Sequence, residues 1–278
     1  MLLKSYAKIN LTLLINRKLS NGMHKIQSFF CLINLFDRII IKKTSKKKDM
    51  IFFTGPYSKN VKKFNNSIHS LLKVMRRNKI LSNYYLIKIH KNIPVFAGFG
   101  GGTSNAATIM DYLINKKAQK KIFDKISEEV GSDLRLFNQK QGYLKDLKTV
   151  VKFRTQHQLH FLIAYPGIKC STKDVYSKVK KYTVAKKFLA NNLRIKSKFI
   201  NYLKNSKNDL QSIVEKKHPV IRRLISSIQR TRGCYFARLT GSGSACYGLF
   251  INENCAKIAL NLIKKKYPKF WFSIAKTI

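Results

Sequence analysis

Acidic residues are scarce in this chain of 278 residues, because 12 Asp and Glu stand against 56 Lys and Arg, giving a formal net charge of +44. Such an excess is typical of proteins that bind nucleic acid or a membrane surface. The basic residues, however, are mostly lysines spread over the whole length among many Asn and Ile, which share A/T-rich codons. A biased genome explains this pattern more simply, and no clustered basic and aromatic motif indicates a specific nucleic-acid partner.

The chain also lacks paired cysteines, a metal-ligand set and long apolar runs. Its five cysteines are an odd number without a C-x-x-C pair, which argues against a disulfide framework or a zinc site and is typical of a reducing compartment. His157 and His160 have no third ligand type nearby. No stretch approaches the ~18 apolar residues of a membrane span, and Lys4, Lys8 and Asn10 interrupt the only early apolar run. We expect a cytoplasmic protein without a membrane partner.

What is present is enough apolar sequence for a core, with 45% hydrophobic and 12% aromatic residues, which excludes global disorder. Alternation of period two predicts strands at 5–15 and 84–91. A short buried strand is expected at 159–165, two strands on either side of the second glycine turn at 236–239 and 246–251, and a last strand at 270–276. A hairpin with arms 38–41 and 50–53 is also expected, and a second hairpin at 142–153. Helical spacing predicts helices at 66–78 and after the glycines near 100. Helices are also expected at 119–130 and 254–266, and largely helical segments at 172–204, 208–216 and 219–231. Strands dominate before residue 155 and helices after it, which predicts domains at 1–155 and 156–278.

The most informative stretch is 94–107, PVFAGFGGGTSNAA, in which four of the five residues 98–102 are glycine. It lies between a predicted strand and a predicted helix. Glycines accept left-handed backbone angles and let a ligand approach closely, while the N–H groups and dipole of the next helix favour an anion. Thr103 and Ser104 suit the N-cap of that helix. A glycine turn without a ligand is the alternative, but the density of glycine favours a phosphate-binding loop.

Two charged residues stand out, Lys8 on the first predicted strand and Asp133 in the turn Gly131-Ser132-Asp133. An aspartate at such a turn can cap a helix or shape the turn. It can also act as a general base if a lysine keeps it ionised beside a phosphate site. Among the histidines, His24 is the one we expect to touch a ligand. The second glycine turn, 241–243, is typical of a simple hairpin.

Three motifs together resemble the GHMP kinase superfamily. They are Ala7-Lys8-Ile9-Asn10-Leu11, the stretch from Pro94 to Ala107, which is close to the pattern P-x-x-x-G-L-G-G-G-S-S-N-A-A, and the stretch from Leu239 to Cys246. The turn at Asp133 matches the usual place of the catalytic aspartate. Within the superfamily, the 4-diphosphocytidyl-2-C-methyl-D-erythritol kinases are most similar, through Asn21-Gly22-Met23-His24, Pro166-Gly167 and Asn208-Asp209-Leu210.

The resemblance covers nearly the full length and implies an α+β, two-domain GHMP kinase fold. The N-terminal, ATP-binding domain (1–155) would resemble ribosomal S5 domain 2, and the C-terminal domain (156–278) would be ferredoxin-like. The implied reaction transfers the γ-phosphate of ATP, with Mg²⁺, to the 2-hydroxyl of 4-diphosphocytidyl-2-C-methyl-D-erythritol in non-mevalonate isoprenoid biosynthesis. Asp133 would accept the hydroxyl proton, and Lys8 would keep Asp133 ionised and offset phosphate charge.

The resemblance also implies binding residues. Those expected to bind ATP are Pro94, Val95, Phe96, Ala97, Gly98, Phe99, Gly100, Gly101, Gly102, Thr103 and Ser104, with Asn65 and Lys91 near the adenine. Those expected to bind the substrate are Asn10, Met23, His24, Tyr176 and Gly241, with His24 and Tyr176 meeting the cytosine.

Some positions depart from the family pattern. Met23 replaces a tyrosine and so removes one aromatic wall of the cytosine pocket. Ala97 replaces a glycine, which is tolerable at negative φ, and Arg135 stands where the family has a proline. The alternatives are another GHMP kinase of the homoserine or mevalonate type, or a basic RNA-binding protein. We expect a small-molecule enzyme, monomeric or homodimeric.

Overall fold

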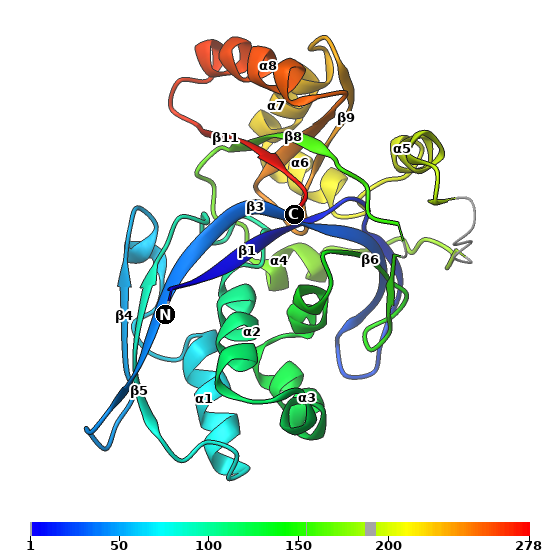
Figure 1. Ribbon diagram of the computed structural model, residues 1–278. Coiled ribbons are helices and arrows are strands. Elements are labelled where there is room, and N and C mark those ends of the chain that lie inside the picture. The colour runs from blue at the N-terminus through cyan, green and yellow to red at the C-terminus, as the bar shows by residue number, and fades with distance from the viewer. Residues whose placement is uncertain (1, 154, 187–192) are drawn as a thin grey trace. The chain divides into compact units, whose positions relative to one another are not determined.

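The structure is a computed structural model that describes residues 2–153, 155–186 and 193–278 (Figure 1). The chain forms two compact units that interleave along the sequence: unit 1 is Met1–Lys8, Leu35–Val95 and Gly100–Asn138, and unit 2 is Ile9–Asn34, Phe96–Phe99 and Gln139–Ile278. The family domain boundary expected at 155 is a different division and stays a prediction. No helix in the described ranges is both long and apolar enough to cross a membrane.

The sheet of unit 1 uses strands β3 (His24–Thr44), β4 (Met50–Thr54) and β5 (Tyr84–His90). Strand β5 lies in the middle, antiparallel to residues 38–44 of β3 and parallel to β4. The hairpin predicted for 38–41 and 50–53 is therefore wrong. Helix α1 (Ser67–Arg77) connects β4 to β5, and a helical crossover of this kind is how parallel neighbours are joined. Strand β1 (Leu2–Asn10) also pairs with β3.

Helices α1, α2 (Gly101–Leu113) and α3 (Lys116–Val130) pack together in unit 1, followed by the 3₁₀ segment η2 (Ser132–Asn138). Their apolar faces meet the sheet in one core, as the helical spacing predicted. Members of that core with no exposed surface include Ile39, Ile87, Ile89, Leu71, Met75, Ile109 and Met110. The helices predicted at 66–78 and 119–130 are confirmed. Asn66 caps α1 by accepting hydrogen bonds from the N–H groups of Ile68 and His69.

Unit 2 contains a four-stranded antiparallel sheet in the order β11-β8-β10-β9. The strands are β8 (His160–Tyr165), β9 (Cys234–Leu239), β10 (Cys246–Phe250) and β11 (Trp271–Lys276). Helices α7 (Pro219–Gln229) and α8 (Glu253–Lys266) contact this sheet (Figure 1), and α6 (Gln211–Lys217) contacts α7. The hairpin predicted at 142–153 is confirmed as β6 (Gln141–Leu144) and β7 (Val150–Lys152).

Two further expectations need correction in unit 2. The predicted helix 172–204 is instead α4 (Thr172–Ser177) and α5 (Lys196–Lys204), with residues 187–192 outside the described part of the chain. Residues 178–186 are not helical, because their backbone bonds elsewhere: the N–H of Thr183 donates to the carbonyl of Ile15, and the N–H of Lys186 to the side chain of Gln27. The predicted strand 5–15 divides into β1 and β2 (Leu14–Lys18), and residues 7–15 are fully buried rather than half-buried.

Candidate active site

The glycine stretch ends in the start of helix α2, within unit 1. Gly100 is the N-cap, in the left-handed region with φ 68°, so Thr103 and Ser104 lie in the first turn and not at the cap as expected. The N–H of Ser104 makes the first intrahelical bond, to the carbonyl of Gly100. The N–H groups before it have no intrahelical acceptor. With the helix dipole they form a site suited to an anion.

Side chains from other elements lie close to the glycines of this helix start. A Cβ added at Gly100 would lie 2.9 Å from Cζ of Phe137 and 3.2 Å from Cε of Lys8. One added at Gly102 would lie 3.2 Å from Oγ of Ser67. Glycine at position 100 is therefore required both by its backbone angle and by the closeness of the lysine stem.

Lys8 and Asp133, the predicted catalytic pair, are brought together in unit 1. Lys8 Nζ lies 3.2 Å from Asp133 Oδ2, with side-chain exposures of 5% and 37%. The turn that carries Asp133 starts at Gly131, with φ 132°, and a Cβ there would lie 3.9 Å from Oγ1 of Thr103. The carboxylate is thus next to the first turn of α2 and accessible, while the lysine is buried beneath it. This arrangement can hold an anion and accept a proton beside it.

Arg135, which departs from the family pattern close to Asp133, is directed towards helix α3. Its guanidinium pairs with Asp124 and lies 4.7 Å from the centroid of the Phe123 ring. These contacts account for the arginine without involving Lys8 or Asp133, the predicted catalytic pair.

Lys91 and Ser104 occupy places that the sequence did not suggest. Lys91 is 2% exposed, and its ammonium donates to Asp37 and, at 3.0 Å, to Oδ1 of Asn105. Burial lowers the pKa of Lys91, although the neighbouring Asp37 carboxylate acts in the opposite direction. The hydroxyl of Ser104 donates to the carbonyl of Tyr6 at 2.6 Å and lies 2.7 Å from Oγ of Ser5. Both assignments to ATP binding stay predictions, and the side-chain placements do not support them.

Asn65, the other residue predicted near the adenine, is exposed and left-handed, with φ 55°. Beside it in the chain, Phe64 is 73% exposed, and its ring centroid lies 6.2 Å from that of His69. Nδ1 of His69 is buried and has no hydrogen-bond partner in the described part of the chain. Phe64 and His69 carry no sequence motif, and only the tertiary structure brings their rings together.

In unit 2, the other part of the glycine stretch packs against the second glycine turn. A Cβ on Gly98, where φ is 87°, would lie 2.3 Å from the carbonyl oxygen of Thr240, and one on Gly241 would lie 3.0 Å from that of Gly98. The N–H of Ala245 donates to the carbonyl of Ala97 at 3.1 Å. Positive φ falls on Phe96 (59°) and not on Ala97. The second glycine turn is therefore more than a hairpin loop, because backbone approaches backbone there.

The residues predicted to meet the cytosine form an aromatic group in unit 2. His24 is buried, and its ring centroid lies 5.2 Å from that of Tyr176 and 6.4 Å from that of Tyr182, a residue that no sequence motif marks. Burial, with a smaller effect of Lys18, lowers the pKa of His24. Met23 is 47% exposed beside it. The group offers stacking surfaces and a neutral imidazole at pH 7.

Asn10 and Gly241 are also neighbours in unit 2. Asn10 is 2% exposed, and a Cβ at Gly241 would lie 3.4 Å from its Oδ1. Its Nδ2 donates to Oγ of Ser28 at 2.8 Å, and its N–H donates to Oγ1 of Thr240 at 3.0 Å. The bond from Nδ2 orients the side-chain amide of Asn10, and the bond from the N–H holds its backbone.

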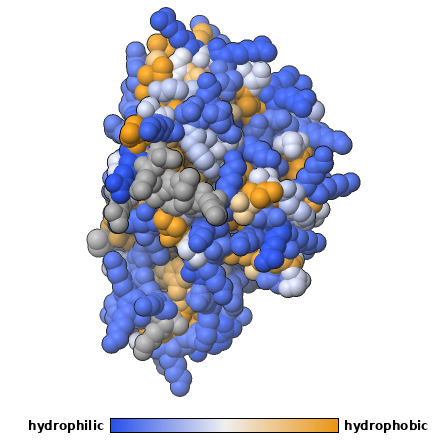
Figure 2. Space-filling model, turned by 90° about the vertical axis from the view of Figure 1, so that its right-hand side faces the viewer, coloured by the Kyte–Doolittle hydropathy of each residue, from blue (hydrophilic) through white to orange (hydrophobic). Residues whose placement is uncertain are grey.

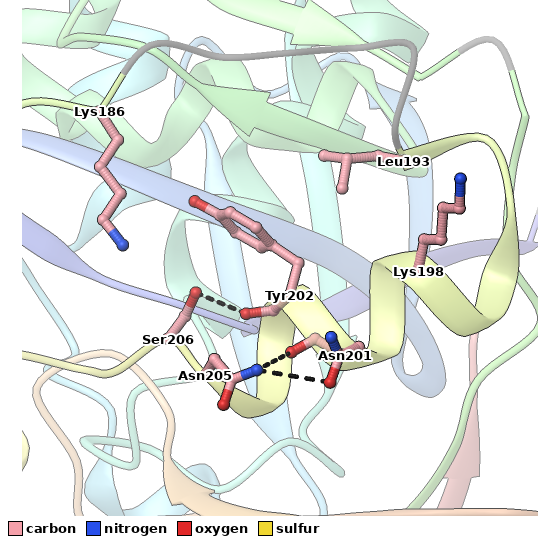
Figure 3. A pocket seen from close by; sticks show the side chains of 7 residues that line it. All are labelled: Lys186, Leu193, Lys198, Asn201, Tyr202, Asn205 and Ser206. Carbon is pink, nitrogen blue, oxygen red and sulfur yellow. Dashed lines mark hydrogen bonds between the residues drawn. The ribbon is translucent and has the colours of Figure 1, made fainter.

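Away from these residues, unit 2 has a hollow of about 290 Å³ beside α5, lined by Lys186, Leu193, Lys198, Asn201, Tyr202, Asn205 and Ser206 (Figure 3). None of the predicted site residues lines it.

Hydrophilic residues cover most of the molecular face in Figure 2, and apolar residues form separate groups. The described ranges contain no group of three or more His, Cys, Asp or Glu that could hold a metal ion.

Comparisons with known proteins identify the fold and the family of the chain. The family described as "GHMP kinases C terminal" matches residues 184–269. A crystal structure of 4-(cytidine 5'-diphospho)-2C-methyl-D-erythritol kinase superposes with a TM-score of 0.72 at 19% identity, covering 99% of both chains. A homoserine kinase from Cytophaga hutchinsonii gives a TM-score of 0.68 at 16% identity, covering 100% of this chain and 94% of that one. The fold is therefore that of the GHMP kinases.

Sequence similarity narrows the class. A 4-diphosphocytidyl-2-C-methyl-D-erythritol kinase from Pelagibacter ubique is 37% identical over 281 residues, covering 99% of this chain and 98% of the relative. This chain belongs to the 4-diphosphocytidyl-2-C-methyl-D-erythritol kinase family.

Proposed function

We propose that this protein transfers the γ-phosphate of ATP to the 2-hydroxyl of 4-diphosphocytidyl-2-C-methyl-D-erythritol, a step of non-mevalonate isoprenoid biosynthesis. The observation that carries the proposal is the Lys8–Asp133 pair, 3.2 Å apart beside the start of helix α2. The names of the family relatives support the choice of substrate.

In the proposed reaction, the substrate hydroxyl oxygen attacks the γ-phosphorus as the bond to the β-phosphate oxygen breaks, giving ADP and a phosphate ester. Asp133 takes the hydroxyl proton, for which its partly exposed carboxylate is suited. The ammonium of Lys8 offsets the negative charge of the carboxylate and of the phosphates. The N–H groups at the start of α2 donate hydrogen bonds to phosphate oxygens, so that catalysis rests on positioning and electrostatics.

We propose that ATP binds as its complex with Mg²⁺. Mg²⁺ in nucleotide sites keeps several waters and is held mainly by phosphate oxygens with few protein ligands. The helix start fits such an ion, because hard oxygen donors lie there: Thr103, Ser67 and the carboxylate of Asp133. When bound, the ion would neutralise charge on the β- and γ-phosphates.

Substrate recognition is proposed to involve unit 2. His24 and Tyr176 would hold the cytosine ring by stacking and hydrogen bonding, and the fixed amide of Asn10 would bond polar groups of the substrate. We further propose a cytoplasmic enzyme, monomeric or homodimeric, for which the lysine excess has no specific nucleic-acid target.

The test is a coupled ADP-release assay with the cytidyl substrate, homoserine and mevalonate offered separately. We expect turnover with the cytidyl substrate only. Turnover with another alcohol in its place would identify a different GHMP kinase. RNA binding that survives physiological salt and does not need Asp133 would favour the alternative class, because contacts made only to phosphates weaken steeply with salt.

A further inference from the structure

Asp37, a buried residue of unit 1, connects the segment just before the glycine stretch with the start of helix α2. It is 0% exposed. Its Oδ1 accepts from the N–H of Asn92 at 2.8 Å and from the N–H of Ile93 at 2.9 Å, just before Pro94. Its Oδ2 accepts from Nδ2 of Asn105 at 3.0 Å, in the first turns of α2. One carboxylate therefore holds the chain on both sides of the glycines 98–102, just before the stretch and in the first turns of α2.

Lys91 bonds both Asp37 and Asn105 in this contact. Its ammonium donates to Asp37 and to Oδ1 of Asn105, and Nζ would lie 3.5 Å from a Cβ added at Gly101. A carboxylate has about four lone-pair positions, and Asp37 uses them on Lys91, Asn92, Ile93 and Asn105. The group is internally satisfied, so it has no need of a ligand for its own hydrogen bonds.

The same group extends to the strand that carries Lys8. Nδ2 of Asn105 also donates to Oγ of Ser5 at 2.9 Å, and Ser5 lies 2.7 Å from Oγ of Ser104. Ser104 in turn donates to the carbonyl of Tyr6. The first turns of α2 are thereby fixed in register with strand β1, on which Lys8 lies.

Stability alone is a weak reason for such a group. Replacing a buried ion pair by apolar side chains of similar volume is often neutral or stabilising. A fully satisfied buried polar group instead favours one arrangement over others, because every displaced partner loses its bonds. The burial that lowers the pKa of Lys91 also makes this ammonium depend on Asp37.

We propose that Asp37, Lys91 and Asn105 are positioning residues that set the anion-binding start of α2 against Lys8, and so determine nucleotide affinity without touching the nucleotide. This inference rests on the proposed function, since it assumes that ATP binds at that helix start. Asp37, Lys91 and Asn105 are called the loop clip below.

The test compares the affinity for Mg·ADP, by calorimetric titration, with resistance to urea. Asn105→Leu removes the helix side of the clip but leaves the Asp37–Lys91 pair. Misplacing groups by about 1 Å can slow a reaction by about a hundredfold. We expect displacement of the helix start to weaken binding as well, and the Kd for ADP to rise at least tenfold. The KM for the cytidyl substrate should stay within about twofold of wild type.

The matched control is Asp49→Asn, at another multiply bonded carboxylate of unit 1. Asp49 accepts from Nε and Nη2 of Arg76 and from the N–H of Tyr85, and lies outside the clip. It should lower urea resistance while leaving the Kd for ADP within about twofold. If Asn105→Leu does not fold, Ser5→Ala removes only one hydroxyl and should still raise the Kd several-fold.

The outcomes are distinct. An unchanged Kd in Asn105→Leu, or in Ser5→Ala where the first variant does not fold, overturns the clip while the proposed function stands. Equal increases in Kd for the clip variant and Asp49→Asn, at equal loss of stability, would reduce the clip to a merely structural contact and also overturn it. If the wild type does not bind Mg·ADP, the proposed function fails and the clip falls with it.

Discussion

The replacement Asp133→Asn is the most direct test of the proposed chemistry. It keeps the shape of the side chain and one carbonyl-type oxygen for Lys8, but removes the negative charge and the ability to take a proton. General base catalysis contributes typically about 10² to 10⁴ in rate. At about 1.36 kcal/mol per factor of ten, we expect the activation barrier to rise by about 2.7 to 5.4 kcal/mol.

The same change should leave the protein folded. At the 3.2 Å separation of Lys8 and Asp133, the Coulomb attraction is about 1.3 kcal/mol in water and about 5 kcal/mol at an effective dielectric constant of 20. The Asp133 side chain is 37% exposed, so water replaces much of the lost interaction. Ion pairs that water reaches contribute about 0 to 1 kcal/mol. If the activation barrier rises by more than this contribution of the ion pair, the loss of activity reports on catalysis and not on folding.

The assay is ADP release at saturating concentrations of both substrates, with ATP affinity and urea unfolding measured on the same samples. The control is Asp124→Asn, a carboxylate with 74% side-chain exposure that pairs with Arg135; it should keep wild-type activity. We expect Asp133→Asn to bind ATP within about threefold of wild type. If it retains more than a few percent of kcat, the assignment of Asp133 as the base is refuted.

Three other predictions address the nucleotide and substrate residues. Gly100→Ala places a Cβ 2.9 Å from Phe137 at φ 68°. It should lower the free energy of urea unfolding by about 1–2 kcal/mol or more, the cost of a left-handed residue, and raise the KM for ATP. The control is Gly22→Ala, which has open space around its Cβ and should leave the KM for ATP unchanged. Met23→Tyr should lower the KM for the cytidyl substrate by adding a ring beside His24, and an unchanged KM would mean that side chain 23 does not face the cytosine. Because the pKa of His24 is lowered in the folded state, the unfolded chain binds the proton first as pH falls through about 6.5. This histidine should therefore contribute to a loss of stability below that pH, and His24→Gln should reduce the pH dependence of stability. The urea midpoint is measured at pH 7.5 and below pH 6.5 for both proteins, and an equal fall in the midpoint of wild type and variant would contradict the prediction.

Local sequence pattern was sufficient for many elements of the fold. The spacing of Ile68, Leu71, Leu72 and Met75 predicts helix α1, because those positions lie on one face of a helix and are buried in the core. The same holds for the hairpin 142–153. Strand neighbours were not predictable in this way: β4 and the end of β3 each alternate like strands, but nothing local shows that β5 lies between them.

For the site, the sequence alone indicated which segments we expect to carry chemistry. Glycines before a helix predict an anion-binding start, and Lys8 and Asp133 stand out by charge and motif. Only the tertiary structure decided how they meet. The side chain of Lys8 packs against Gly100, and its Nζ lies 3.2 Å from Oδ2 of Asp133. It also decided that Lys91 bonds Asp37 inside the protein, and that Tyr182 lies near His24. The physical reason is that periodicity and turn chemistry are local, whereas the partner of a buried charge or ring depends on contacts between segments far apart in the chain.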